Sequence, residues 1–334
     1  MNIIIPMAGR GTRMRPHSIT TPKPLIPIAG KAMVHRILED ITATSNEKIE
    51  DVVFIVGRFG EEAENALLKV ANSLGAKGHI VYQDEPKGTA HALLCAKEFL
   101  KGNVFIAFAD TLFKATFKID TEKDAIIWTQ KVENPEAFGV VTLDENGKII
   151  SFVEKPTTFV SDLAIIGVYY FKDGENLKNE MKYLIDNQIM QKGEYQLTDA
   201  MENMKEKGLG FYTGQVEEWL DCGNKDATLF TMERILEIKK SSEDLIHNTH
   251  TNENSVVIEP CFIGKNVVLK NSVIGPHVSL EEGSVVENAV ISKSIIGKNS
   301  IVKNSIISKS LLGNNVACSS KSEELSLGDY SFKL

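Results

Sequence analysis

The sequence lacks the usual features of secreted proteins, of membrane-spanning proteins and of small domains held together by a structural metal. Its four cysteines are scattered and form no C-x-x-C pair, so they indicate neither a zinc ribbon nor a disulfide framework. Its apolar runs, such as residues 52–56, are far shorter than the roughly 18 residues of a membrane span. The first residues also lack the basic and long apolar segments of a signal peptide. We therefore expect a cytoplasmic protein without a membrane partner.

A net positive charge is also missing. The chain carries 37 Lys and Arg against 45 Asp and Glu, which gives a net charge of -8. Binding to nucleic acid through its phosphates needs a basic patch or stripe, so we expect no nucleic-acid partner. Residues 1–38 are an exception, because they contain no Asp or Glu but six basic residues: Arg10, Arg13, Arg15, Lys23, Lys31 and Arg36. This cluster predicts a local affinity for phosphate.

The first 240 residues alternate β-rich runs with amphipathic helical patterns. This alternation is typical of an α/β fold, in which helices cover both faces of a largely parallel sheet and ligands bind beyond the carboxyl ends of its strands. Residues 125–171 are rich in strands and lack long helices. The other predicted strands are 2–7, 51–56, 79–82 and 104–109, and the predicted helices are 33–44, 61–73, 89–99, 175–191, 197–207 and 225–239.

The last third of the chain has a different pattern. After a polar stretch at 241–255, which we predict to be a linker, Val, Ile or Leu recurs every five or six residues over 257–316. One inward apolar residue per flat face, with Gly, Asn or Ser at the corners, is typical of hexapeptide repeats. We predict an α/β domain at 1–240, a short left-handed parallel β-helix at 256–318 and a polar tail at 319–334. Short sandwich strands are the alternative for the repeats.

A glycine-containing loop follows the first predicted strand. Residues 8–16 read A-G-R-G-T-R-M-R-P, in which the glycines let backbone amides approach phosphate oxygens and Arg13 can offset their charge. The loop is not a Rossmann fingerprint, because Met14 replaces the third glycine and the prolines that follow prevent an immediate helix. It also lacks the Walker A pattern. An extended, proline-stiffened nucleotide loop remains.

Taken together, the motifs of residues 1–240 resemble one family. G-R-G-T-R-M-R-P and T-P-K-P-L-I-P-I-A-G-K are similar to the opening of the sugar-phosphate nucleotidylyltransferases, the glucose-1-phosphate thymidylyl- and uridylyltransferase group. Six later motifs follow in order: Q-D-E-P-K-G-T-A from 83, F-A-D-T from 108, F-G-V-V from 138, V-E-K-P from 153, E-Y-Q-L-T-D from 194 and W-L-D-C-G from 219. The resemblance implies a Rossmann-like mixed sheet of the nucleotide-diphospho-sugar transferase type.

The resemblance also implies which residues hold a nucleoside triphosphate. Arg13 and Lys23 would act on the triphosphate as catalytic residues. Gln83 offers an acceptor beside a donor, which complements N3-H and O4 of uracil or thymine, although the same amide can also pair with adenine. The predicted nucleotide-binding set is Ala8, Gly9, Gly11, Thr12, Arg13, Gln83, Pro86, Gly88 and Thr89.

Two aspartates are the predicted metal ligands. Asp110 follows a predicted strand in the expected crevice, where a carboxylate beside a triphosphate needs a cation between them. Asp221 lies between an apolar Trp-Leu pair and a glycine turn. Mg2+ is commonly held by one or two carboxylates together with phosphates and water. The resemblance therefore implies a Mg2+ cofactor on Asp110 and Asp221.

A second group of residues would bind the sugar phosphate. By resemblance, Lys155 neutralises the phosphate as the third catalytic residue, Glu154 accepts hydrogen bonds from sugar hydroxyls, and Gly139 and Ile165 complete the set. A solvated Glu-Lys pair is the alternative for 154–155. The segment 194–199 either faces the sugar or is simply a helix start with Thr198 as its cap.

The predicted reaction joins a nucleoside triphosphate to a sugar 1-phosphate and releases pyrophosphate. The sugar phosphate already carries an ionised oxygen, since the second pKa of a phosphomonoester is about 6, so no general base is required. dTTP or UTP with glucose 1-phosphate are the expected substrates. Contacts one hydroxyl or methyl wide decide between such substrates, so the sequence leaves the nucleotide and the sugar open.

The sequence also bears on two other functions and on one assembly state. A non-catalytic nucleotide-sugar-binding regulatory subunit would be expected to lose a metal Asp or Arg13, and this chain keeps them. A bifunctional enzyme would transfer acyl groups in the β-helix, where His277 is the only histidine of the repeats. A histidine at a Pro-His corner is more typical of an exposed turn. Stacked coils leave terminal edges that need covering, which favours a homo-oligomer.

Overall fold

A computed structural model describes residues 1–9, 11–114 and 118–321. Arg10 of the basic cluster and most of the predicted polar tail lie outside the described residues. The chain divides into two compact units, of which unit 1 comprises residues 1–26 and 31–227, and unit 2 comprises residues 27–30 and those from 228 onward.

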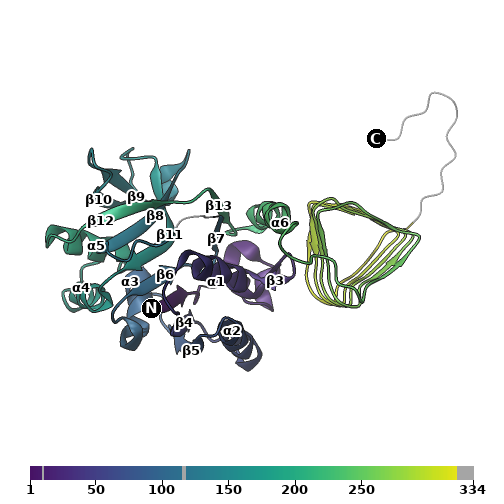
Figure 1. The fold of residues 1–334 in the computed structure, drawn as a ribbon, viewed down its shortest axis with the longest axis horizontal. Coiled ribbons are helices and arrows are strands. Elements are labelled where there is room, and N and C mark those ends of the chain that lie inside the picture. The colour runs from purple at the N-terminus through teal and green to yellow at the C-terminus, as the bar shows by residue number, and fades with distance from the viewer. Residues whose placement is uncertain (10, 115–117, 322–334) are drawn as a thin grey trace. The chain divides into compact units, whose positions relative to one another are not determined.

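Unit 1 is built on a nine-stranded mixed sheet in the order β10-β9-β11-β6-β1-β4-β5, with β8 paired to β11 and β12 (Figure 1). β1 pairs in parallel with β4 and β6, while β11 runs antiparallel to β6, β8 and β9. The strands are β1 (Asn2–Pro6), β4 (Asp51–Val56), β5 (Lys77–Tyr82), β6 (Val104–Ala107), β8 (Ala125–Lys131), β9 (Gly139–Leu143), β10 (Ile149–Glu154), β11 (Leu163–Phe171) and β12 (Phe211–Gln215). The predicted α/β fold with a mixed sheet is confirmed.

The central strands are buried on both faces, which explains why they consist of aliphatic residues in succession. All five residues of β1 are buried, as expected for a parallel strand covered by helices on either side. The covering helices are α1 (Met33–Thr44), α2 (Glu61–Ser73), α3 (Thr89–Cys95), α4 (Gly174–Asp186) and α5 (Leu197–Glu206). Short β7 (Thr111–Lys114) pairs antiparallel with β13 (Glu218–Asp221) beside this sheet.

Two predicted helices are shorter in the structure. The helix expected at 175–191 ends as α4 at Asp186, because Gln188 has a left-handed φ of 56° that cannot continue a helix. The helix expected at 89–99 ends at Cys95 and is followed by a separate 3-10 turn at Lys97–Phe99. The four cysteines are free thiols. Within the described ranges, no helix is both long and apolar enough to cross a membrane.

Unit 2 contains α6 (Lys225–Lys239), of which residues from Thr228 belong to this unit, and a coil of short parallel strands with three flat faces (Figure 1). Five strands stack in one face and four in each of the other two. The strands of the coil are β14 (Thr251–Glu253), β15 (Val256–Val257), β16 (Cys261–Ile263), β17 (Val268–Lys270), β18 (Val273–Ile274), β19 (Val278–Leu280), β20 (Val285–Glu287), β21 (Val290–Ser292), β22 (Ser294–Ile296), β23 (Ile301–Lys303), β24 (Ile306–Ser308), β25 (Leu311–Leu312) and β26 (Ala317–Ser319). Unit 2 also contains the two-residue strand β2 (Pro27–Ile28), whereas β3 (Lys31–Ala32) belongs to unit 1. This arrangement is consistent with the predicted left-handed β-helix.

Buried aliphatic residues fill the interior of the coil, one from each face. Leu269, Val286 and Val302 stack in register along the five-stranded face and are fully buried. At the corners, asparagines adopt left-handed φ values, which asparagine tolerates better than other residues with a Cβ. Asn271 and Asn288 also donate side-chain hydrogen bonds, each 3.2 Å long, to the next asparagine of the ladder. β14 already pairs with β17, although its residues lie in the range predicted as a linker.

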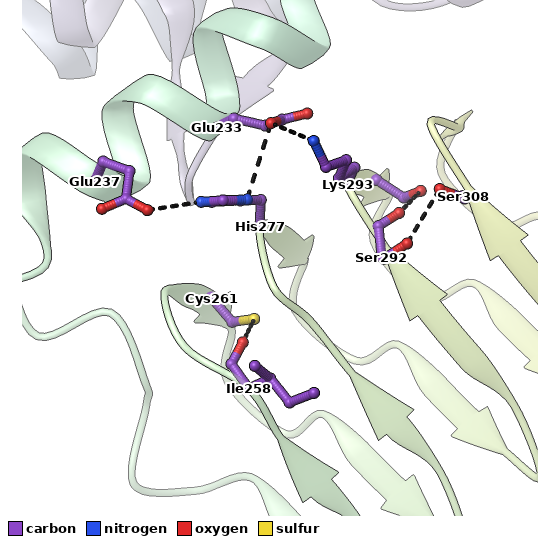
Figure 2. Close-up of polar contacts among 9 residues, drawn as sticks. Glu233, Glu237, Ile258, Cys261, His277, Ser292, Lys293 and Ser308 are labelled. Atoms are coloured by element: carbon purple, nitrogen blue, oxygen red, sulfur yellow. Dashed lines mark hydrogen bonds and ion pairs between the residues drawn. The ribbon is translucent and has the colours of Figure 1, made fainter.

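Within unit 2, His277 links α6 to the coils (Figure 2). Its Nε2 lies 2.8 Å from Oε1 of Glu237, and its Nδ1 lies 3.8 Å from Oε2 of Glu233. Lys293 also donates to Glu233, at 3.2 Å. The side chain of His277 is only 19% exposed, so the expectation of an exposed turn residue is wrong: its φ of 60° fits a turn, but α6 covers the ring.

Candidate active site

The nine predicted nucleotide-binding residues all line one cavity of about 410 Å³. They come from the loop after β1 and the loop after β5. Lys23 and Asp110 line the same cavity, the latter after β6. Because β1, β5 and β6 belong to one parallel part of the sheet, their carboxyl ends open at the same edge. The cavity lies where the sheet topology places a ligand site.

The loop after β1 is shaped by a glycine turn. Gly11 has a left-handed φ of 57°, and a Cβ added there would lie 3.0 Å from Cβ of Lys23. The carbonyl of Gly11 accepts a hydrogen bond from Ser18 Oγ at 2.7 Å. Glycine therefore allows the backbone to turn tightly beside Lys23, which brings the lysine next to the loop that carries Arg13.

The loop after β5 is clamped to the start of α5. Its Lys87 carbonyl accepts from the Tyr195 amide at 2.9 Å, and the Ala90 amide donates to the Tyr195 carbonyl at 3.0 Å. Gly88 lies between these bonds with a φ of 108°, and an added Cβ would stand 2.4 Å from the Tyr195 carbonyl oxygen. No side chain fits there. The close approach of Gly88 to Tyr195 fixes the position of this loop, from which Gln83 lines the cavity.

Asp110 and Asp221 come together across the β7-β13 ladder. Asp221 is the register partner of Thr111, and the amide of Cys222 donates to the carbonyl of Asp110 at 2.9 Å. The amide of Gly223 orients the Asp221 carboxylate through a 3.0 Å bond to Oδ1. Burial, and next the charge of Asp110, raise the pKa of Asp221 above its ordinary value. Two acidic groups therefore share one partly buried place.

This pair of carboxylates fits a divalent cation. Lys23 Nζ lies 2.7 Å from Oδ2 of Asp110, so the lysine ammonium already pairs with this carboxylate. The positive charges of Lys23 and Arg13 both lower the pKa of Asp221, against the effects of burial and Asp110. Among the described residues, no group of three or more His, Cys, Asp or Glu could hold a metal alone. Two carboxylates suit Mg2+, which takes its other ligands from phosphates and water.

A second cavity, of about 190 Å³, adjoins the first through the shared lining residues Thr89 and Phe108. Three of the predicted sugar-phosphate residues line it: Gly139, Glu154 and Ile165. A Cβ on Gly139 would lie 2.9 Å from Oε2 of Glu154, so glycine keeps this cavity open. The first cavity is lined by two basic and two acidic residues, whereas the second combines one carboxylate with aliphatic and aromatic walls.

Lys155 lines neither cavity. It follows the end of β10 with a left-handed φ of 43°, and its ammonium lies 3.8 Å from Oε1 of Glu154 with half of the side chain exposed. The structure thus places Lys155 beside Glu154, which lines the second cavity. This arrangement matches the solvated Glu-Lys pair, which was the alternative for these two residues.

The segment 194–199 contributes more than the sequence revealed. Gln196 and Thr198 line the second cavity, and Glu194 lines the first. Thr198 is not the helix cap: α5 begins at Leu197, and the Thr198 hydroxyl instead donates to Oε2 of Glu154 at 3.3 Å. Tyr169 of β11 also lines the second cavity, and apart from its hydroxyl group nothing in the sequence of that strand distinguishes it as a site residue. For Glu194, Gln196 and Thr198, the motif E-Y-Q-L-T-D was the signal in the sequence that could have predicted their place in the cavities.

Comparison with known proteins decides the family. The nucleotidyl transferase family model matches residues 2–237, the part of the chain that carries both cavities. The chain belongs to the nucleotidyl transferase family. The predicted family and enzyme class are therefore confirmed.

This nucleotidyl transferase chain is similar to proteins that differ in length. It is 31% identical over 263 residues to the bifunctional protein GlmU of Methanococcus maripaludis strain S2, covering 78% of this chain and spanning 60% of that relative. It is 29% identical over 307 residues to glucose-1-phosphate thymidylyltransferase of Streptomyces griseus, covering 86% of this chain and 84% of the relative. A solved UDP-glucose pyrophosphorylase in complex with UDP-glucose shares the fold, with a TM-score of 0.58 at 22% identity over 71% of this chain and 98% of that chain.

Proposed function

We propose that this protein transfers a nucleotidyl group from UTP or dTTP to glucose 1-phosphate and releases pyrophosphate. The observation that carries the proposal is the junction of the two cavities. One is lined by every predicted nucleotide-binding residue with Lys23 and Asp110, and the other by Gly139, Glu154 and Ile165. The names of the Streptomyces and pyrophosphorylase relatives support the same substrates.

In the proposed reaction, an ionised phosphate oxygen of the sugar phosphate attacks the α-phosphorus, and pyrophosphate leaves. Arg13 and Lys23 hold the triphosphate and offset its charge, and Glu154 accepts hydrogen bonds from the sugar. Lys155, beside Glu154, neutralises the sugar phosphate. Asp110 and Asp221 would hold Mg2+, which would supply charge stabilisation at the phosphates. No residue is required as a general base, because the nucleophile carries no proton at neutral pH.

A pyrophosphate-release assay tests this proposal. The protein is incubated with each of UTP, dTTP, CTP, ATP and GTP and with a panel of sugar 1-phosphates, with and without Mg2+. We expect release with UTP or dTTP and glucose 1-phosphate, and only with Mg2+ present. Release that is independent of the sugar phosphate, or none with any pair, would refute the proposal. The second result would favour the regulatory-subunit alternative if the protein still bound nucleotide sugar.

Acyl transfer by the β-helix is not favoured by the surroundings of His277. Both ring nitrogens face carboxylates of α6, namely Glu237 and Glu233 (Figure 2). A base that accepts a proton from a substrate needs one nitrogen within hydrogen-bond reach of that substrate. We propose a structural role for this histidine, and nucleotidyl transfer as the activity of the chain.

We also propose that the protein is a cytoplasmic homo-oligomer. On one face of the β-helix, Val256, Val273, Val290 and Ile306 are in register and point outward, and the side chain of Ile306 is 87% exposed. A row of exposed β-branched residues is more typical of a contact surface than of a solvated one. Light scattering after size exclusion should give a multiple of the chain mass of 36.9 kDa, and Ile306→Lys should lower it. A monomeric wild-type protein would refute this proposal.

A further inference from the structure

The amide of Gln83 is held in one orientation by two neighbours. Its Nε2 lies 3.5 Å from the carbonyl oxygen of Gly88 and 3.3 Å from Nδ1 of His91. A carbonyl oxygen only accepts, so the nitrogen end of the amide must face this side. His91 Nδ1 must then accept as well, which requires the neutral ring with its proton on Nε2. In the described ranges, no hydrogen bond to the amide oxygen of Gln83 is present.

His91 is suited to this acceptor role. It lies in the first turn of α3, whose start is fixed by the clamp between the preceding loop and Tyr195. Burial, and next the charge of Lys87, lower the pKa of His91 below 6.5, while Glu85 acts in the opposite direction. Lys87 and Glu85 pair with each other in the loop before the helix. The ring is therefore neutral at pH 7 to 8, as an acceptor must be.

We propose that His91 is a positioning residue that turns the oxygen of the Gln83 amide toward the bound base and so selects uracil or thymine. The inference rests on the proposed function, in which Gln83 meets the base. An oxygen facing N3 accepts from uracil or thymine, whose N3 carries a proton. The same oxygen is repelled by the lone pair on N3 of cytosine, which carries none. Without His91, only the 3.5 Å contact with the Gly88 carbonyl holds the amide, so the amide turns more easily and CTP can meet its nitrogen instead.

Nucleotide binding to wild type and two variants tests the inference. His91→Leu removes the acceptor, and His91→Asn is the matched control because its side-chain oxygen can accept near the place of Nδ1. We measure the affinities for UTP and CTP by calorimetry. In wild type UTP binds more tightly than CTP. His91→Leu should lower the UTP-to-CTP affinity ratio about tenfold, the usual effect of one lost hydrogen bond, whereas His91→Asn should preserve most of it.

Two further measurements separate positioning from a general loss of structure. The KM for UTP should rise in His91→Leu while kcat stays near wild type, because the reacting groups are untouched. Protonation of His91 Nδ1 removes the acceptor in wild type, so the UTP-to-CTP ratio should fall as the pH is lowered from 8 through the pKa of His91, which lies below 6.5. The ratio cancels the ionisation that the two triphosphates share. In His91→Leu the ratio should change less with pH than in wild type, and the change that remains measures protonation of N3 of cytosine.

The outcomes distinguish this inference from the proposed function. Pyrophosphate release by wild type with UTP or dTTP tests the function alone. If wild type is active but His91→Leu keeps both the UTP-to-CTP ratio and its pH dependence, the inference is overturned and the function stands. A wild-type protein that binds CTP as tightly as UTP also overturns it. Should His91→Leu fail to fold, the wild-type pH series and His91→Asn decide in the same way.

Discussion

At the residue scale, the ion pair between Lys23 and Asp110 leads to a prediction about metal binding. The ammonium lies 2.7 Å from the carboxylate and the lysine side chain is only 11% exposed, so a metal that binds Asp110 must compete with it. Lys23→Met should therefore increase the affinity of the substrate-free protein for Mn2+ about fivefold, as expected for the loss of one competing ion pair. Electron paramagnetic resonance of free Mn2+ measures this affinity. A weaker affinity in the variant would show that Lys23 does not compete at this site.

The second cavity gives a prediction for sugar binding. Gly139→Ala would place a Cβ 2.9 Å from Oε2 of Glu154 and 3.3 Å from Cδ1 of Ile165. We expect the KM for glucose 1-phosphate to rise at least about tenfold, the usual cost of one misplaced carbon, with little change in the KM for the nucleotide. Gly313→Ala is the control, because nothing lies within 4 Å of its added Cβ. Equal changes in both KM values would contradict the assignment of the cavity.

Asp199 gives a prediction for the dependence of stability on pH. Burial, and next the charge of Glu154, raise the pKa of Asp199 to about 6, and its Oδ2 is buried without a hydrogen bond. Since the folded state prefers the protonated acid, this group lowers the free energy of unfolding as pH rises from the unfolded value of 3.8 to about 6, and the loss persists above. Asp199→Asn should therefore have a higher Tm than wild type at pH 8 and no advantage at pH 4. An equal difference at both pH values would rule out titration of Asp199 as the cause.

At the element scale, the β-helix depends on one inward aliphatic residue per face. Ile291 is fully buried in the core of the coil, whereas Ile301 points outward and is 42% exposed. Ile291→Ala should lower the free energy of unfolding by about 2 to 5 kcal/mol, and Ile301→Ala by less than about 1 kcal/mol. Urea denaturation of both variants measures the difference. Similar losses would mean that the stack of inward residues does not hold the coil together.

Helices and strands with a regular spacing of apolar residues were predictable from the sequence. Their ends were predictable only where the neighbouring residues give a local signal. α1, α2 and β4 begin and end at the predicted residues because their apolar pattern and flanking polar residues agree. The end of α4 was missed, since Gln188 takes the left-handed backbone of a local helix cap, in which the Ile189 amide donates to the Leu184 carbonyl at 2.9 Å, and glutamine is not a residue type that favours this conformation. The first strand of the coil, β14, was missed because its three residues T-N-E are all exposed.

The same distinction applies to the candidate site. Residues in glycine loops or in ordered motifs, such as Gly11 and Gln83, could be assigned because their neighbours in sequence carry the signal. Tyr169 could not, since its place beside Glu154 comes from pairing between distant strands, and Thr198 lies in a segment for which the sequence left open whether it faces the sugar or starts a helix. His91 has no motif of its own, and only the fold brings it to the amide of Gln83.

At the scale of the whole molecule, the chemistry assigned to unit 1 depends on Asp110 and Asp221 acting as one metal site. The β7-β13 ladder brings their backbones together, and their charges interact. In the proposed function, this place serves both the triphosphate and the sugar phosphate, and it lies within the part of the chain that the nucleotidyl transferase family model matches. Unit 2 supplies no residue to either cavity among those described.

The most direct measurement is Mg2+-dependent pyrophosphate release by Asp110→Asn from UTP or dTTP and glucose 1-phosphate. Asn keeps the size of the side chain but removes its charge. The rate should fall more than about a hundredfold, because several kcal/mol of charge stabilisation depend on the bound metal, while the Tm stays near that of wild type. Asp186→Asn on α4, at a residue that lines neither cavity, should retain the wild-type rate. An Asp110→Asn protein that works at nearly the wild-type rate would contradict the metal site and the mechanism built on it.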